Sequence, residues 1–121
     1  LRPSKAIFTN ASQSHARRVL SALGVSPSHF ECIFDFEAAG YCPKPDPEAY
    51  RRILARLGAR GDQCVLVEDN LRNLETAKSV FGMTTVLVKK TGRAARCRDE
   101  AAQADLVIGD ILELERVLGE A

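Results

Sequence analysis

The sequence predicts an α/β fold with a mostly parallel sheet, and two observations support this prediction. Short aliphatic segments typical of buried strands alternate with longer segments in which apolar residues recur at helical spacing. The first three helical segments each stop at a glycine, a common helix end. Strands that alternate with helices in this way form βαβ units, whose strands are parallel and whose crossovers are right-handed.

The predicted elements follow one another along the whole chain. Asp46 and Asn70 are the expected N-caps of the second and third helices, and Pro47 stands at a first helical position, where its missing N–H is harmless. The first helix is expected to bury Ala16, Val19, Leu20 and Leu23. The predicted strands are residues 5–9, 32–36, 63–67, 84–88 and 105–108, and the predicted helices are residues 12–23, 47–57, 71–81 and 111–118.

Composition limits the classes of protein that fit. With 121 residues and 45% hydrophobic content, we expect a single domain over residues 1–121. The net charge is +1, and the basic run at residues 89–98 has no interleaved aromatic residue to stack on bases. We therefore expect no nucleic-acid partner and interpret that run as a solvated loop, with phosphate or nucleic-acid contact as the alternative.

Cysteine usage and hydropathy limit the location of the protein. Its four cysteines are scattered and form no Cys-x-x-Cys pair, which argues against a structural zinc site and a disulfide scaffold. Free thiols fit a reducing cytoplasm, the location that we expect. No segment approaches the length of about eighteen apolar residues that a membrane span needs, so no membrane partner is expected.

Two adjacent carboxylates, Glu68 and Asp69, directly follow the aliphatic strand at residues 63–67. Ligands of parallel α/β sheets bind beyond the carboxyl ends of the strands. Mg²⁺ usually takes one or two protein carboxylates and fills its other positions with water and phosphate oxygens. The pair therefore suggests a magnesium site. The alternative is that these acids only cap the next helix.

Two upstream segments carry further candidates. Thr9 ends the first strand, and with Asn10 it could bind an anion at the start of a helix, although Asn10 or Ser12 could also be a plain helix cap. Lys44 lies between two prolines that stiffen its backbone, so it could neutralise a phosphoryl group or be an ordinary surface lysine. We expect Thr9, Lys44 and the carboxylates to converge on one edge of the sheet, as phosphate with Mg²⁺ requires.

These segments resemble the haloacid dehalogenase-like phosphohydrolases. Ile-Phe-Thr-Asn at residues 7–10 is similar to the second motif of the family, Lys-Pro-Asp-Pro at 44–47 to the third, and Val-Glu-Asp-Asn at 67–70 to the fourth. The residues around these motifs look most like the pyrimidine 5′-nucleotidase branch. The resemblance implies a Rossmann-like, three-layer α/β/α core. It also implies a Mg²⁺-dependent phosphomonoester hydrolase that acts on a small substrate such as a nucleoside monophosphate.

The resemblance also implies a role for each residue. Thr9, Asn10 and Lys44 would bind the phosphate, and Thr9 and Lys44 would be catalytic. Glu68 and Asp69 would hold Mg²⁺, directly or through water. Asn70 and Asn73 would support these ligands from behind, and the alternative for Asn73 is an ordinary amide on the helix surface.

One departure from the family matters most. The first motif, Asp-x-Asp-x-Thr, provides the nucleophile that becomes an aspartyl-phosphate and the general acid and base, and residues 1–121 contain no such motif. The nearest sequence, Phe-Asp-Phe-Glu at 34–37, follows the second motif and lacks the threonine. We therefore expect a partial core without its central nucleophile strand and its cap, inactive by itself.

The missing first motif also bears on partners and on the alternative to an enzyme. A missing central strand would expose strand edges, which a complementing N-terminal segment or a homodimer could cover. The alternative to an enzyme is a non-catalytic phosphate-binding or interaction module that has kept the fold.

Overall fold

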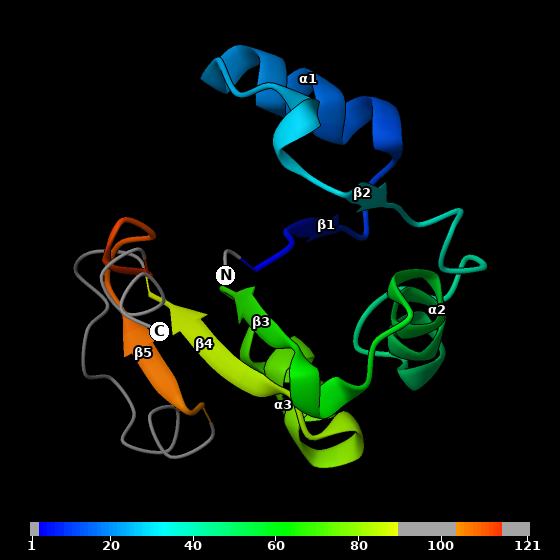
Figure 1. Cartoon of the computed structure of the whole chain (residues 1–121), viewed down its shortest axis with the longest axis vertical. Helices are drawn as coiled ribbons and strands as arrows, with labels where there is room; N and C mark the ends of the chain where they lie inside the picture. Colours follow the sequence, from blue (N-terminus) through cyan, green and yellow to red (C-terminus); the bar gives the residue numbers. More distant parts are fainter. Residues whose placement is uncertain (1–2, 90–103, 115–121) are drawn as a thin grey trace. The chain divides into compact units, whose positions relative to one another are not determined.

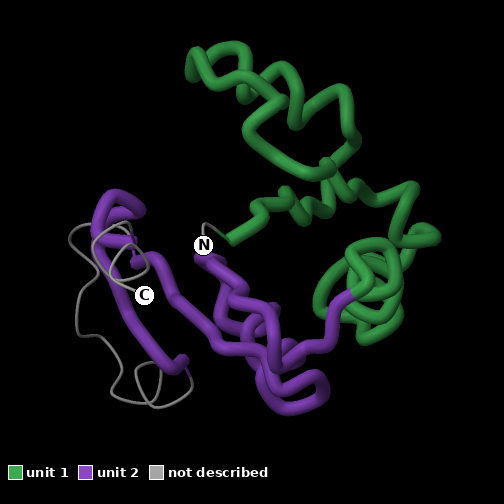
Figure 2. The backbone as a smooth tube through the Cα atoms, in the orientation of Figure 1, with its two compact units in different colours: residues 1–58 green, residues 59–121 purple. Residues whose placement is uncertain are grey.

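The computed structural model describes residues 3–89 and 104–114 and divides the chain into two compact units, residues 1–58 and 59–121 (Figure 2). The expectation of a single domain stays a prediction. Most of the basic run at residues 89–98 and the second half of the predicted helix at residues 111–118 lie outside the described residues, although residues 113 and 114 are helical.

The first unit is a parallel βαβ unit followed by a helix (Figure 1). Strand β1 (Ala6–Phe8) pairs in parallel with β2 (Cys32–Phe34), and Ile7 lies opposite Ile33. Helix α1 (Gln13–Leu23) and a short 3₁₀ helix, η1 (Pro27–His29), connect the two strands. Helix α2 (Pro47–Leu57) follows the loop that carries Lys44.

Helix α1 ends where predicted, begins one residue later than predicted, and has a narrower buried face than predicted. Its N-cap is Ser12, whose hydroxyl accepts a hydrogen bond from the backbone N–H of His15 at 3.1 Å. It ends at Gly24, whose φ of 72° lies in the left-handed region that glycine adopts without strain. Among the four predicted core residues, Ala16 and Leu20 are buried, whereas Val19 and Leu23 are 44% and 69% exposed. The predicted stripe is therefore only half buried in this structure.

Aromatic packing forms the core of the first unit. The rings of Phe8 and Phe34 meet edge to face with centroids 5.9 Å apart, and Phe8 meets Tyr50 of α2 in the same way at 5.4 Å. Tyr50 is fully buried, and Ile53 one turn later is 5% exposed. The predicted N-cap of this helix is confirmed, because a carboxylate oxygen of Asp46 accepts the backbone N–H of Glu48 at 2.9 Å.

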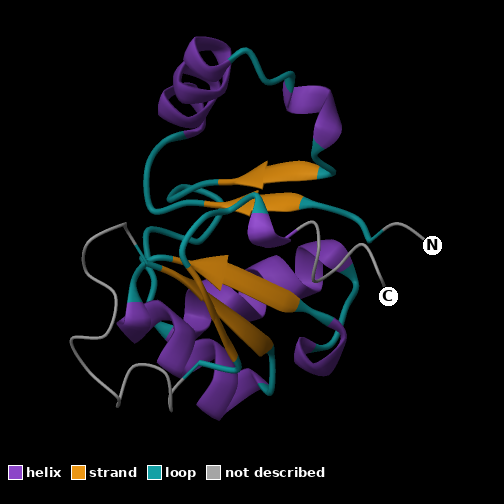
Figure 3. Ribbon diagram, turned by 90° about the vertical axis from the view of Figure 1, so that its left-hand side faces the viewer, coloured by secondary structure: helices purple, strands orange, loops and turns teal. Residues whose placement is uncertain are grey.

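The described part of the second unit is a three-stranded parallel sheet covered by a helix (Figure 3). Its strands are β3 (Val65–Glu68), β4 (Thr84–Val88) and β5 (Leu106–Ile108), in that order. Helix α3 (Leu71–Phe81) packs against β3 and β4. The buried residues Leu74, Leu87 and Ala104 form the core of this unit.

The chain enters β3 through a 3₁₀ helix, η2 (Gly61–Gln63), so the predicted strand start at Gln63 is two residues too early. A side chain on the buried Gly61 would overlap the carbonyl oxygen of Phe81 at the end of α3. Cys64, directly before β3, is only half-buried. Burial and then the charge of Asp62 raise the pKa of its thiol.

A polar network joins β4 to the start of β5. A carboxylate oxygen of Asp105 accepts the backbone N–H of Thr85 at 2.8 Å and its hydroxyl at 3.1 Å, and the Thr85 hydroxyl accepts the backbone N–H of Asp105 at 3.1 Å. The Lys78 ammonium of α3 lies 3.1 Å from the other oxygen of Asp105. Thr85 is fully buried, so this reciprocal pairing satisfies polar groups that water cannot reach.

The α/β fold with parallel strands that the sequence predicts is confirmed. Among the described residues, β1 has one hydrogen-bonded neighbour, β2, and β3 also has one, β4. Each of these two strands therefore has one edge without a partner strand in the described part of the chain. No helix within residues 3–89 and 104–114 is long and apolar enough to span a membrane.

Candidate active site

In the first unit, Thr9 follows β1 and is held in place by the sheet. Its backbone N–H donates to the carbonyl oxygen of Phe34 at 3.0 Å. Its hydroxyl oxygen accepts the backbone N–H of Ala11 at 3.0 Å. Because the hydroxyl is the acceptor in that bond, its own proton is directed elsewhere and can be donated to an anion.

The side chain of Asn10 binds the backbone of Lys44, which is 34 residues later in the sequence. The side-chain oxygen of Asn10 accepts the backbone N–H of Lys44 at 2.8 Å, and its Nδ2 donates to the carbonyl oxygen of Lys44 at 3.1 Å. The backbone N–H of Asn10 donates to none of the described residues. If Asn10 contributes to phosphate binding, the backbone N–H is therefore the group available for it.

The Lys44 side chain returns to the end of β1. Its ammonium donates to the carbonyl oxygen of Phe8 at 2.7 Å and lies 4.6 Å from the centre of the Phe8 ring. Both contacts favour a cation, because the carbonyl oxygen and the ring face each carry partial negative charge. The first unit therefore brings Thr9, Asn10 and Lys44 together, with the ammonium bound to the residue that precedes Thr9.

In the second unit, Glu68 ends β3 and is held by its neighbours. Its Oε1 accepts the side-chain N–H of Asn73 at 2.7 Å, and its Oε2 accepts the backbone N–H of Asp69 at 3.1 Å. Asn73 lies on α3 and is only 7% exposed. Its side chain therefore fixes the orientation of Glu68 from the buried side.

Asp69 differs from Glu68 in its surroundings. Its side chain is exposed and makes no hydrogen bond or ion pair with the described residues. Asn70 has a structural role as the N-cap of α3, because its side-chain oxygen accepts the backbone N–H of Arg72 at 3.0 Å. The carboxylate of Asp69 thus remains available to bind a ligand at the start of α3.

The chemistry of this donor set fits a hard divalent cation. Glu68, Asp69 and Asn70 offer oxygen atoms and neither sulfur nor imidazole, which suits Mg²⁺ better than zinc. Within the described residues, no group of three His, Cys, Asp or Glu side chains could hold a metal ion. One or two carboxylates are the usual protein share of a magnesium site, with water and substrate oxygens as the other ligands.

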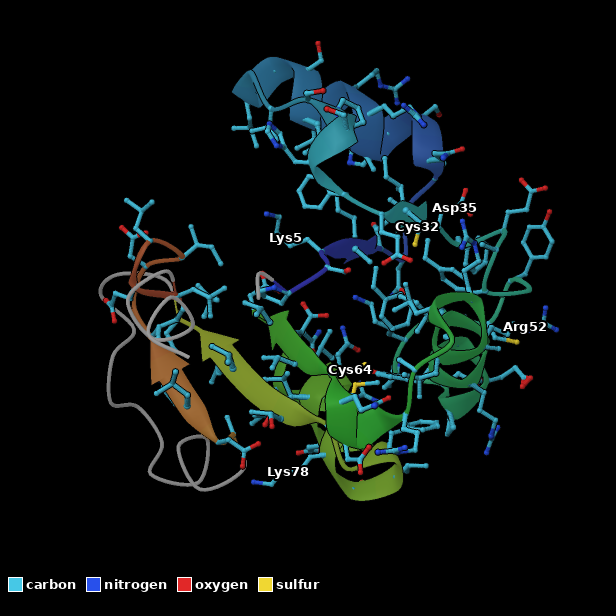
Figure 4. All side chains as sticks on the ribbon, in the orientation of Figure 1. Lys5, Cys32, Asp35, Arg52, Cys64 and Lys78 are labelled. Carbon is cyan, nitrogen blue, oxygen red and sulfur yellow. The ribbon has the colours of Figure 1, made fainter. Side chains whose placement is uncertain are left out.

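Asp35, the aspartate of the sequence that most resembles the missing motif, has a structural role (Figure 4). One carboxylate oxygen accepts the backbone N–H of Gln13 at 3.1 Å, and the other accepts that of Ala38 at 2.9 Å. Both oxygens are occupied in joining α1 to the loop after β2. That Asp35 is not the nucleophile stays a prediction.

Sequence reasoning missed the part that Phe8 plays at this site. Its carbonyl oxygen and its ring both contact the Lys44 ammonium, although the sequence marks it only as an apolar strand residue. An aromatic residue directly before Thr9 is a weak signal, because aromatic residues are common in strands for packing reasons alone.

Comparisons with known proteins identify the family of this chain. They also show what share of each relative's length the chain matches. A family model described as haloacid dehalogenase-like hydrolase matches residues 3–80. Over 62 residues the chain is 39% identical to enolase-phosphatase E1 of Streptomyces avermitilis. The matched segment is 51% of this chain and 25% of that protein. The chain therefore spans only a quarter of the length of this curated relative.

Solved structures agree with the family match. The chain superimposes on a HAD phosphatase from Thermococcus onnurineus with a TM-score of 0.75 and 27% identity, covering 96% of this chain and 50% of that one. An L-2-haloacid dehalogenase from Xanthobacter autotrophicus has the same fold at 17% identity, with a TM-score of 0.75, and the match covers 94% of this chain and 54% of that one. Because the family model matches well over half of its residues, the chain belongs to the haloacid dehalogenase-like hydrolases.

Proposed function

We propose that the whole protein is a Mg²⁺-dependent phosphomonoester hydrolase, with a nucleoside monophosphate as its expected substrate. Residues 1–121 contain no Asp-x-Asp-x-Thr, so the proposal assigns the nucleophilic aspartate to a further part of the whole protein. In the proposed reaction, a carboxylate oxygen attacks phosphorus and the ester P–O bond breaks. The leaving oxygen takes a proton and departs as an alcohol. Water then hydrolyses the aspartyl-phosphate and releases inorganic phosphate.

The observation that carries the proposal is the exposed carboxylate of Asp69, which has no partner among the described residues, beside the fixed carboxylate of Glu68. Two neighbouring carboxylates repel an anionic substrate unless a cation stands between them. A dehalogenase also handles anions, because a 2-haloacid carries a carboxylate and the displaced halide leaves as an anion, but a phosphoryl group offers several negative oxygens that can coordinate such a cation. The pair therefore favours a phosphatase over a dehalogenase.

The first unit offers what the phosphoryl oxygens need. The Thr9 hydroxyl can donate its proton, the backbone N–H of Asn10 is available, and the Lys44 ammonium is held close to both by Phe8. Donors fixed before the reaction stabilise developing negative charge without reorganisation at that moment. That these donors and the two carboxylates act on the same phosphoryl group is part of the proposal.

When bound, Mg²⁺ would neutralise phosphoryl charge and orient the ester. Asp69 and Glu68 would hold it, directly or through water, and Asn73 would keep Glu68 in place through the 2.7 Å hydrogen bond. The nucleotide part of the proposal is supported by the sequence around the motifs, which is similar to pyrimidine 5′-nucleotidases. The free thiols of Cys32, Cys42 and Cys64 support a cytoplasmic location.

Phosphate release by the whole protein tests the proposal. The assay compares nucleoside monophosphates, simple sugar phosphates and 2-chloropropionate, each with Mg²⁺ and with EDTA. We expect hydrolysis of phosphomonoesters only with Mg²⁺, fastest with a pyrimidine nucleotide, and no chloride release. Chloride release that EDTA does not affect would show a dehalogenase instead. Binding of inorganic phosphate without turnover of any substrate would favour the alternative, a non-catalytic phosphate-binding module.

A further inference from the structure

Asn10 forms a two-point hydrogen bond with a single residue of the lysine loop. Its side-chain oxygen accepts from the backbone N–H of Lys44 at 2.8 Å, and its Nδ2 donates to the carbonyl oxygen of Lys44 at 3.1 Å. A primary amide has an acceptor on one side and a donor on the other, so it matches the two backbone groups of one residue. Both polar atoms of this side chain are therefore engaged with Lys44.

The local sequence explains why this bond matters for the loop. Pro43 and Pro45 have no backbone N–H, so Lys44 provides the only backbone donor of these three residues. Other backbone bonds of the loop are local, such as Tyr41 to Phe36 at 3.0 Å and Asp46 to Pro43 at 2.9 Å. They shape the loop without joining it to the end of β1. The Asn10 side chain makes that connection for the backbone.

We propose that Asn10 is a positioning residue, which fixes the Lys44 backbone so that the ammonium stays at the end of β1 beside Thr9. The side chain of Asn10 would then not contact substrate at all. This inference rests on the proposed function, because it assigns Asn10 an effect on phosphoryl transfer that passes through Lys44.

The expected effect follows from the flexibility of lysine. A lysine side chain has four methylene groups and loses considerable rotamer freedom when its ammonium is held at one place. Without the two backbone bonds, the loop can move and the 2.7 Å contact between the ammonium and the Phe8 carbonyl is no longer enforced. Small displacements of a catalytic group reduce rates strongly, and we expect about a tenfold loss of kcat.

A double-mutant cycle in the whole protein tests this proposal. The variants are Asn10→Ala, Lys44→Met and their combination, and kcat and KM are measured for nucleoside monophosphate hydrolysis. If Asn10 acts only through Lys44, Asn10→Ala lowers kcat about tenfold alone but has almost no further effect in the Lys44→Met background. An equal loss in both backgrounds would overturn the proposal, because Asn10 would then act independently of Lys44.

Two further variants exclude a general folding effect. Ser12→Ala removes a nearby helix cap, the 3.1 Å bond to His15, without touching Lys44, and its kcat should stay within about twofold of wild type. Asn10→Asp has the same shape as asparagine and keeps one acceptor, but it turns a second oxygen toward the Lys44 carbonyl. Asn10→Asp should also lower kcat, and this loss should nearly disappear in the Lys44→Met background.

A second measurement separates failure of this inference from failure of the proposed function. Amide hydrogen exchange of the Lys44 backbone N–H, followed by NMR in the whole protein, reports the Asn10 bond whether or not the protein hydrolyses anything. We expect exchange at Lys44 to be at least tenfold faster in Asn10→Ala than in Ser12→Ala. Unchanged exchange would refute the positioning role. Faster exchange in Asn10→Ala, in a protein with no phosphatase activity, would refute the proposed function but confirm that the Asn10 side chain holds the Lys44 backbone.

Discussion

Glu68 and Asp69 are adjacent in the sequence but have different surroundings, which predict different consequences of substitution. Glu68 accepts hydrogen bonds from Asn73 and from the backbone of Asp69, whereas the Asp69 side chain is exposed and unpartnered in the described part of the chain. A carboxylate with no protein partner is free to enter the coordination shell of a cation. We therefore assign the larger share of metal binding to Asp69.

Metal titrations of the whole protein test this assignment. Asp69→Asn should weaken Mg²⁺ binding strongly, and high Mg²⁺ should restore part of the activity. Asn73→Ala leaves both carboxylates in place but releases Glu68, and we expect about 10–100-fold weaker Mg²⁺ binding, the usual effect of losing a residue that orients a ligand. Asp62→Asn changes another exposed carboxylate of the same unit and should leave Mg²⁺ affinity unchanged. Tight Zn²⁺ binding that survives Asp69→Asn would contradict the assignment.

Residue by residue, the sequence is informative about which groups are present and less so about what they bind. The candidates Thr9, Asn10 and Lys44 could all be chosen from their motifs. The pairing of the Asn10 side chain with the Lys44 backbone could not, because it joins residues 34 positions apart and depends on how the loop after β2 folds back. No local pattern encodes such a contact.

At the level of elements, ends were easier to predict than buried faces. Helices α1, α2 and α3 end at the predicted glycines, because Gly24, Gly58 and Gly82 all adopt a positive φ. Strand β4 has the predicted bounds, because a short run of β-branched and aliphatic residues strongly favours a strand. The exposure of Val19 and Leu23 could not be predicted, because helical periodicity shows an apolar face but not what covers it.

The polar network of Asp105 that joins β4 to β5 should make the free energy of unfolding of the protein depend on pH. The backbone N–H of Thr85, and then Lys78, lower the pKa of Asp105. A lowered pKa in the folded state means that the charged carboxylate favours folding. Its contribution is present above the unfolded value, about 3.9, and is lost as the pH falls through the lower folded value.

The pH dependence of the free energy of unfolding, measured from pH 7 to pH 2 in the whole protein, tests this expectation. Asp105→Asn should lose less stability than wild type as the pH falls below about 4, because no charge remains to be neutralised there. Lys78→Met should keep most of the wild-type slope, since the Thr85 backbone bond is the larger cause. Equal slopes for wild type and Asp105→Asn would show that Asp105 titrates alike in both states.

For the whole molecule, the unpaired edges of β1 and β3 matter most. Each has a single strand neighbour among the described residues, and the chain spans half of the length of the Thermococcus onnurineus phosphatase. Unpaired backbone groups at an edge are satisfied by another strand or by water. We propose that an N-terminal segment of the whole protein, which would carry the nucleophile, supplies a strand to these edges.

Complementation tests that proposal. Residues 1–121 by themselves should show no phosphatase turnover, because their sequence contains no Asp-x-Asp-x-Thr to provide the nucleophile. Adding the upstream segment, fused or as a separate polypeptide, should restore Mg²⁺-dependent hydrolysis and raise the melting temperature. A segment with its first motif aspartate changed to asparagine is the matched control, since it should restore stability but not activity. Full turnover by residues 1–121 alone would refute the proposal.

The Lys44 ammonium, held at the end of β1 by the Phe8 carbonyl oxygen, is proposed to stabilise the transferring phosphoryl group. The most direct measurement is kcat for nucleoside monophosphate hydrolysis by the whole protein and by Lys44→Met at saturating Mg²⁺. Lys5→Met, which removes an exposed lysine just before β1, serves as the control. We expect Lys44→Met to lower kcat by roughly 10²–10³-fold, the usual effect of removing one preorganised contact to the transition state, while Lys5→Met stays near wild type. Equal kcat values for wild type and Lys44→Met would contradict the proposal.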